Sequence, residues 1–282
     1  MRNYPRISIV TPSYNQGQFL EETILSVLKQ DYPNLEYIII DGDSTDNSVD
    51  IIKKYKDQVT YWVSEEDRGQ THAINKGLRK STGEILNWLN SDDLLKIGAL
   101  NTIAEYFRKY PEAEFCFGDF SVIDKKGREI FSRKSAPYSF HSLLYGRQLS
   151  IQPSVFFRRC ILEKIGYLDE TLSFCMDQEF WIRAAVEGSK FYQTKKTLAK
   201  ARFHGDTKTS RLQKVLKEEH KAIVRKYTKW GFKEGTTKED LYYTFLNRIW
   251  RTINAIKRLI YRGDHTFMDF SIALKRINKE SC

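Results

Sequence analysis

Two adjacent aspartates, Asp92 and Asp93, follow closely on an apolar run at residues 85–89. Adjacent carboxylates repel each other, and a hard divalent cation offsets that repulsion. Mg²⁺ and Mn²⁺ prefer oxygen ligands and commonly bridge one or two carboxylates to phosphate oxygens. Either aspartate can instead cap the helix that follows. On its own, the pair leaves metal binding and helix capping open.

A second acidic turn, DGDSTDNS, carries Asp41, Asp43 and Asp46 directly after the apolar run at residues 35–40. The same residues make a good turn and helix cap, so structure alone can explain them. A third polar loop, SEEDRGQ, occupies residues 64–70. If these loops gather around one crevice, they would suit a metal ion and a nucleotide. One aspartate would then accept hydrogen bonds from a base or ribose, and another would bind the cation that neutralises a diphosphate.

Two common phosphate-binding motifs are absent from the sequence. It contains no GxxxxGK[ST], so it lacks the P-loop that holds a triphosphate. No GxGxxG follows the first apolar run, so we expect no dinucleotide site. A nucleotidyltransferase needs a triphosphate donor site and is disfavoured. A diphosphate would be held mainly by a metal ion and side chains.

The elements that position these loops alternate between short apolar runs and stretches with helical spacing. This alternation predicts a parallel sheet with helices on both faces. In such sheets ligands lie beyond the carboxyl ends of the strands, which is where the acidic loops fall. We expect strands at residues 6–11, 35–40, 59–63 and 85–89, and helices at 18–30, 46–55, 70–80 and 97–109.

The pattern changes after residue 113. Residues 115–123 and 128–132 resemble a hairpin around Lys125-Lys126-Gly127. Further strands are expected at 154–157 and 197–203, a helix at 177–187, and mainly helices after residue 206. We therefore divide the chain into a first half at 1–113, a second half of the same domain at 114–205, and a helical extension at 206–282.

The positive charge of the chain is concentrated in its extension. Lys and Arg number 46 against 36 Asp and Glu, a formal net charge of +10, and residues 206–282 hold 18 basic and 9 acidic residues. Residues 238–262 combine basic side chains with apolar ones at helical spacing, which suits a helix lying on an anionic membrane surface. The alternative is a helix packed on the protein's own body. We find no nucleic-acid-binding motif.

The cysteines and the N-terminus bear on the compartment. Cys116, Cys160, Cys175 and Cys282 form no CxxC pair, so we expect neither a zinc site nor a disulfide framework. The first residues lack the apolar stretch of a secretory signal, and no run approaches a membrane-spanning length. We expect a cytoplasmic protein that can also lie peripherally on the inner face of the cell membrane.

Five stretches of the chain together resemble the inverting glycosyltransferases of family 2, which have the GT-A fold. They occur in that family's order and at its spacings, and the resemblance covers about residues 1–205. The stretches are residues 8–15 (SIVTPSYN), 39–48 (IIDGDSTDNS), 73–77 (AINKG), 82–93 (TGEILNWLNSDD) and 177–183 (DQEFWIR).

The resemblance implies donor-binding roles in the first half. Thr11, Pro12 and Tyr14 would border the nucleotide, Asp41 would contact the base, and Asp92 and Asp93 would form the metal and diphosphate motif. We assign Asp92 to the nucleotide and Asp93 to the metal, although Asn90 stands where this family often has an acid, which leaves the direct metal ligand open. His204 would approach the metal or diphosphate, or it is simply a surface-loop histidine. The residues concerned are Thr11, Pro12, Tyr14, Asp41, Asn90, Asp92, Asp93 and His204.

The resemblance also implies acceptor-side roles in the second half. Asp177 matches the family's catalytic base, although Met176 replaces the usual Glu; it can also cap the helix that follows. Glu179 is the fallback base and an acceptor-side candidate, or it pairs with Arg183 at i,i+4. The other acceptor-side candidates are Gln152 and Trp181, and the indole of Trp181 can equally belong to the core.

The implied activity is the metal-dependent transfer of a sugar, with inversion, from a nucleotide diphosphate sugar to a hydroxyl. Mg²⁺ or Mn²⁺ is the expected cofactor, a UDP-sugar the favoured donor, and a saccharide or lipid-linked sugar the acceptor, as in cell-surface polysaccharide synthesis. The alternative is a non-catalytic protein that binds a nucleotide sugar or acts as a membrane-associated scaffold.

Overall fold

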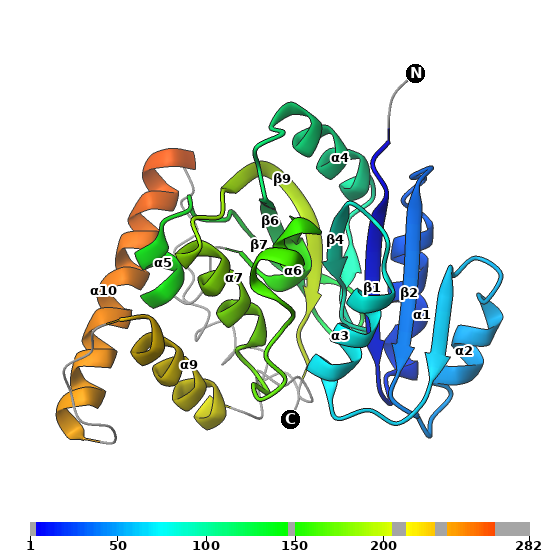
Figure 1. Ribbon diagram of the computed structural model, residues 1–282, viewed down its shortest axis with the longest axis horizontal. Coiled ribbons are helices and arrows are strands. Elements are labelled where there is room, and N and C mark those ends of the chain that lie inside the picture. The colour runs from blue at the N-terminus through cyan, green and yellow to red at the C-terminus, as the bar shows by residue number, and fades with distance from the viewer. Residues whose placement is uncertain (1–3, 146–149, 205–212, 229–235, 263–282) are drawn as a thin grey trace.

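The computed structural model describes residues 4–145, 150–204, 213–228 and 236–262, and it contains one mixed sheet covered by helices on both faces (Figure 1). The path of the sheet runs β3-β2-β1-β4-β8-β6-β9-β5, and β7 pairs with β6.

The first half of the chain forms the parallel part of the sheet. β1 lies between β2 and β4, and β2 pairs with β3, all in parallel. All four strands therefore point their carboxyl ends toward the same edge. The elements are β1 (Ile7–Ser13), α1 (Gly17–Leu28), β2 (Leu35–Asp41), α2 (Ser48–Lys54), β3 (Tyr61–Ser64), α3 (Gln70–Lys80), β4 (Ile85–Trp88), β5 (Leu94–Leu95) and α4 (Ala99–Lys109).

The second half completes the sheet with mixed pairings. β8 runs antiparallel between β4 and β6, and β6 pairs in parallel with the long β9. The elements are β6 (Phe115–Ile123), β7 (Glu129–Arg133), α5 (Phe140–Tyr145), η1 (Gln152–Ser154), β8 (Val155–Arg158), α6 (Cys160–Ile165), α7 (Met176–Val186) and β9 (Phe191–Arg202).

Side-chain alternation along the strands builds a separate core on each face of the sheet. Successive residues of a strand point to opposite faces. Val10 and Ile38 accordingly pack in one core with helices α3, α6 and α7, whereas Ile9 and Ile39 pack in the other with α1, α2 and α4. A side chain at Gly77 would meet Val10 within 2.2 Å, so α3 can approach β1 this closely only through a glycine.

The extension contributes α9 (Gln213–Tyr227) and α10 (Thr237–Arg262). Figure 1 shows both helices at the far end of the molecule from α2, beside α5 and α7. Ile223 and Val224 of α9 and Tyr243 of α10 are buried in the same core as α3 and α7. The first helix of the extension is therefore part of the folded body. No helix in the described segments is long and apolar enough to cross a membrane.

The predicted elements of the parallel half are confirmed to within two residues at each end. The hairpin is confirmed as the antiparallel pair β6 and β7. The predicted strand at 197–203 is too short, because β9 already begins at Phe191 and its polar first half shows no apolar alternation. The short elements β5, α5 and α6 were not expected from the sequence.

Hydrogen bonds tie the loops at the carboxyl edge to one another. The Asn15 side-chain oxygen accepts the backbone N–H of Thr45 at 2.8 Å, and the backbone N–H of Asn15 donates to Ser44 Oγ at 2.8 Å. Asp46 accepts the backbone N–H groups of Gly17 and Ser48, each at 2.9 Å. The loop after β2 therefore fixes both the loop after β1 and the start of α1.

Asp41 anchors this arrangement from the end of β2. Its side chain is fully buried and accepts three hydrogen bonds: from the backbone N–H of Ser44 at 2.9 Å, from Ser44 Oγ at 2.6 Å and from Ser64 Oγ at 2.8 Å. Asp43, in contrast, is exposed and has a φ of 65°. The turn interpretation of DGDSTDNS is therefore confirmed for its hydrogen bonding.

These contacts predict opposite results for two neighbouring substitutions. Asp41→Asn turns one acceptor oxygen into an amide donor that faces other donors, and should lower the free energy of unfolding by about 1–3 kcal/mol. Asp43→Asn is the matched control, because asparagine tolerates positive φ well. This variant should change the free energy of unfolding by less than about 0.5 kcal/mol. Urea unfolding at neutral pH measures both, and equal effects would contradict the anchoring role of Asp41.

Candidate active site

The candidate nucleotide-binding residues after β1 differ in their accessibility. Thr11 is buried, and its hydroxyl lies 3.1 Å from the Tyr37 hydroxyl. Pro12 is also buried. Tyr14, however, is 61% exposed beside the acidic loops. Of these three side chains, Tyr14 is the exposed one, and a nucleotide-binding role for the three stays a prediction.

Asp93 lies deep at the end of β4. Its Oδ1 accepts the backbone N–H of Arg202 at 2.9 Å, and its Oδ2 accepts Asn90 Nδ2 at 3.3 Å. Burial, and then the adjacent Asp92 carboxylate, raise the pKa of Asp93 well above its ordinary value, although the hydrogen bonds from Arg202 and Asn90 oppose the rise. Asp93 therefore holds the end of β4 to the end of β9.

Asp92 faces His204. The two side chains approach to 3.3 Å between Asp92 Oδ2 and His204 Nε2, and the His204 ring packs on Phe19 at 4.8 Å between centroids. A carboxylate beside an imidazole nitrogen is a donor pair that suits Mn²⁺. The described residues contain no cluster of three or more His, Cys, Asp and Glu, so a metal ion here would need further ligands from a diphosphate or water. The pair fits a metal that is shared with a bound ligand.

Arg202 connects this site to the rest of the sheet, although no sequence motif pointed to it. Its backbone N–H binds Asp93, its Nε donates to the Asp92 carbonyl at 3.0 Å, and its guanidinium pairs with Glu22. The guanidinium also lies over the Phe19 ring at 4.8 Å. These contacts span more than 100 residues of sequence, so no local pattern reveals them.

Helix α3 joins the acidic loop to the approach to α7. Gln70 Nε2 donates to Asn90 Oδ1 at 2.7 Å, and the next residue, Thr71, donates to the Leu172 carbonyl at 3.1 Å. Asn75 donates to the Leu168 carbonyl at 2.9 Å. The segment that leads to Asp177 is thus attached to the same helix whose first residue binds the loop of Asp92 and Asp93.

Asp177 lies in the first turn of α7 and is partly buried. Its Oδ1 accepts the backbone N–H of Gln178 at 2.7 Å. Burial raises the pKa of Asp177 to about 6, because desolvation outweighs the hydrogen bonds that favour the charged form. A carboxylate with a pKa near 6 can accept a proton at neutral pH more readily than an ordinary aspartate.

The three acceptor-side candidates are all buried. Glu179 forms an ion pair with Arg183 at 3.0 Å and accepts hydrogen bonds from Tyr227 and Lys226. Burial would raise its pKa, but these partners hold it below the ordinary value. Trp181 is 2% exposed within the core, so its indole face is not presented to a sugar. The structure favours the structural interpretation of both residues.

Gln152 keeps one polar atom without a partner. Its Nε2 donates to the Trp88 carbonyl at 2.6 Å, which fixes the amide beneath the end of β4. Its Oε1 is buried and has no hydrogen-bond partner among the described residues. An acceptor-side role for Gln152 stays a prediction.

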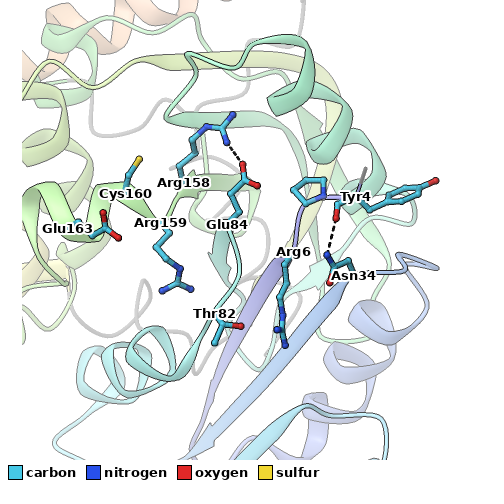
Figure 2. A pocket seen from close by; sticks show the side chains of 10 residues that line it. Tyr4, Arg6, Asn34, Thr82, Glu84, Arg158, Arg159, Cys160 and Glu163 are labelled. Atoms are coloured by element: carbon cyan, nitrogen blue, oxygen red, sulfur yellow. Dashed lines mark hydrogen bonds and ion pairs between the residues drawn. The ribbon is translucent and has the colours of Figure 1, made fainter. Parts of the chain in front are cut away.

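A hollow of about 470 Å³ lies at the opposite edge of the sheet, before the starts of β1 and β4 (Figure 2). Its charged side chains are engaged with protein groups: Arg158 pairs with Glu84, Arg159 donates to the Gly83 carbonyl, and Arg6 pairs with Glu36. None of the candidate residues lines this hollow. We therefore place the functional site at the carboxyl edge.

Comparisons with known proteins show the family and the fold of this chain. Teichuronic acid biosynthesis glycosyltransferase TuaG of Bacillus subtilis, a putative assignment, is 34% identical over 138 residues, which cover 48% of this chain and 54% of the relative. The structure of TarS residues 1–349 of S. aureus with UDP-GlcNAc superposes with a TM-score of 0.64 at 18% identity, covering 97% of this chain and 79% of that one.

A second solved structure has the same fold. The mannosyltransferase PcManGT from Pyrobaculum calidifontis, in complex with GDP-Man and Mn²⁺, superposes with a TM-score of 0.64 at 18% identity, covering 99% of this chain and 80% of that one. The fold expected from the sequence, GT-A, is therefore confirmed. The family model for glycosyl transferase family 2 matches residues 8–166, more than half of the chain, and the chain belongs to that family.

Proposed function

We propose that this transferase moves a sugar, with inversion, from a nucleoside diphosphate sugar to a hydroxyl of a saccharide or lipid-linked acceptor. The observation that carries the proposal is that α3 binds both the loop of Asp92, whose carboxylate faces His204, and the segment that leads to Asp177. The neighbours solved with UDP-GlcNAc and GDP-Man support a nucleotide-sugar donor. The relative named for teichuronic acid biosynthesis supports a role in surface polysaccharide synthesis.

The donor would lie along the carboxyl edge of the parallel strands. The exposed Tyr14 would cover the nucleotide, and Asp41 would hold the loop against which the base rests. We assign Asp92 and His204 as the pair that would hold the metal. Asp93 is less suited, because each of its carboxylate oxygens already accepts a hydrogen bond, from Arg202 and from Asn90. A bound Mn²⁺ or Mg²⁺ supplies a Lewis acid beside the diphosphate.

Asp177 would act from the acceptor side. As a carboxylate it removes the proton of the acceptor hydroxyl, whose oxygen then attacks the anomeric carbon on the face opposite the diphosphate. The configuration at that carbon therefore inverts, and the nucleoside diphosphate leaves. Gln152 Oε1, a buried acceptor without a partner in the described residues, is a candidate to orient an acceptor hydroxyl.

Calorimetry tests the donor and metal assignments. UDP, and GDP in parallel, should bind more tightly when Mn²⁺ is supplied, and we favour UDP. His204→Ala and Asp92→Asn should each weaken binding in Mn²⁺ by at least about tenfold, the scale on which lost metal-site partners act. His141→Ala is the matched control, since His141 is exposed on α5 and stacks on Trp250. Absence of binding by both nucleotides would overturn the proposal.

Asp177→Asn tests the catalytic base. Turnover should fall by about 10²–10⁴-fold while nucleotide binding is unchanged. In the wild type, kcat/KM should decline as the pH falls through about 6, because Asp177 must be ionised to accept the proton. Asp169→Asn, which alters another carboxylate in the approach to α7, is the control. A wild-type rate in Asp177→Asn would exclude this role.

The same variant should be more stable than the wild type. Folding raises the pKa of Asp177 from 3.8 to about 6, so its contribution to stability declines as the pH rises between these values. Asp177→Asn should therefore unfold at higher temperature at pH 7.5, with a gain of up to about 3 kcal/mol, and the gain should vanish below about pH 4. Thermal unfolding at the two pH values measures the difference.

We propose that the enzyme works on an anionic membrane surface, through the outer side of α10. Leu241, Phe245, Ile249 and Ile256 recur at helical spacing on that side, and each is at least 37% exposed. Tyr243 and Asn247, on the other side, are buried. α10 thus has two apolar sides, one packed on the body and one facing outward.

Charge favours anionic lipid as the occupant of this outer side. Lys238, Arg248 and Arg251 are exposed on α10, and each basic residue near an anionic surface contributes about 1 kcal/mol of attraction. The basic residues Lys257, Arg258 and Arg262 also belong to the predicted segment 238–262, and their side chains lie outside the described part of the structure.

Vesicle sedimentation of the full chain tests the membrane surface. The protein should pellet with vesicles of mixed phosphatidylglycerol and phosphatidylcholine but not with pure phosphatidylcholine. Phe245→Glu with Ile249→Glu should abolish pelleting, whereas Ile97→Glu with Val186→Glu, which alters two exposed apolar residues elsewhere, should not. Undiminished pelleting of the α10 variant would contradict the assignment. A second result would also contradict it: a wild-type protein that is dimeric in solution and a Phe245→Glu with Ile249→Glu variant that is monomeric. A second copy of the chain would then be the occupant of this side of α10.

A further inference from the structure

Glu219, on α9 of the extension, binds the backbone immediately before α7. Its Oε1 accepts the N–H of Ser173 at 2.8 Å, and its Oε2 accepts the N–H groups of Phe174 and Cys175 at 2.9 and 2.8 Å. One carboxylate therefore receives three consecutive backbone donors. Glu219 lies 44 to 46 residues beyond these partners in the sequence.

The three donors lie where a helix needs an external partner. The first N–H groups of an α-helix have no acceptor within it, and a negative charge at that end is favoured by the helix dipole. α7 begins at Met176, and its N-cap residue, Cys175, makes no side-chain capping bond. From another helix, Glu219 supplies an acceptor for the N–H of the N-cap residue Cys175 and for the two N–H groups before it, and adds a negative charge at the start of α7.

A second set of contacts holds α9 along α7. Glu179 accepts hydrogen bonds from Lys226 Nζ at 3.1 Å and from the Tyr227 hydroxyl at 2.7 Å. Ile223 and Val224 are buried in the core that also contains Phe180. Because α9 is fixed at its far end by these contacts, the carboxylate of Glu219 is held in place as well.

Asp177 lies two residues beyond the capped segment. Its side chain receives a hydrogen bond from the neighbouring Gln178 N–H, so the first turn of α7 sets its position. We propose that Glu219 is a positioning residue for Asp177, through which the extension orients the acceptor side of the active site. This inference rests on the proposed role of Asp177 as the base.

Glu219→Gln tests the proposal with nearly unchanged shape. In hydrogen–deuterium exchange, the amides of residues 173–175 should exchange faster. Kinetics would follow the release of UDP from UDP-GlcNAc, or of GDP from GDP-mannose, with an alkyl glucoside as acceptor. The kcat of the variant should be lower than that of the wild type by about 10- to 100-fold, which is the scale of a small misplacement at the reacting centre. The KM for the donor should stay within about twofold, because the donor loops do not contact Glu219.

The matched control is Glu218→Gln. Glu218 is the preceding residue on α9, is largely exposed and contacts Lys221 at 3.5 Å. It should leave both exchange and kcat unchanged. Should Glu219→Gln not fold, Glu219→Asp keeps the charge on a shorter side chain, and the same pair of measurements applies to it.

Combining variants separates this inference from the proposed function. If Glu219 acts through Asp177, Asp177→Asn with Glu219→Gln should be no slower than Asp177→Asn alone. Losses that multiply, or a wild-type kcat in Glu219→Gln despite faster amide exchange, would overturn the positioning role while leaving the base intact. A wild-type rate in Asp177→Asn alone would contradict the base and this inference together.

Discussion

Carboxylates that accept backbone N–H groups hold the carboxyl edge of this sheet together. Asp41 closes the loop after β2, Asp46 holds the start of α1, and Asp93 binds β9 to the end of β4. Glu219 does the same before α7. A buried carboxylate is costly unless it is hydrogen-bonded, and backbone donors at turns and helix starts are available without moving a side chain. The loops that would border a donor nucleotide are thereby held in fixed positions.

The sequence predicted those parts of the fold that depend on local pattern. The alternation of apolar runs and helical spacing located the parallel half and placed its acidic loops at one edge, and the order of five motifs identified the family. β9 was underestimated because residues 193–196 are polar, and because the first part of the strand is held by its pairing with the distant β6 at Phe191, Tyr192 and Gln193. Short elements such as α5 carry too few residues for a periodic signal.

Within the candidate site, the sequence indicated which residue types are present but left several of their roles open. It listed Asp93 for the metal but left the direct ligand open between Asp92 and Asp93, and the contact of Asp93 with Arg202, 109 residues away, now favours Asp92, which lies beside His204. It offered Trp181 and Glu179 to the acceptor, but tertiary packing draws both inward. These outcomes depend on long-range contacts, and no spacing rule applied to a single chain encodes them.

The docking of α9 changes where this protein can be divided. The stretch that the family model matches ends at residue 166, before α7 and β9, which invites a boundary at that point. Removing α9 would expose the apolar neighbours of Ile223 and Val224 and strip Glu179 of Tyr227. A chimaera that exchanges acceptor specificity between related transferases must therefore take α7 and α9 from the same parent. A junction between the two helices would separate α7 from the carboxylate of Glu219, which binds the backbone before it.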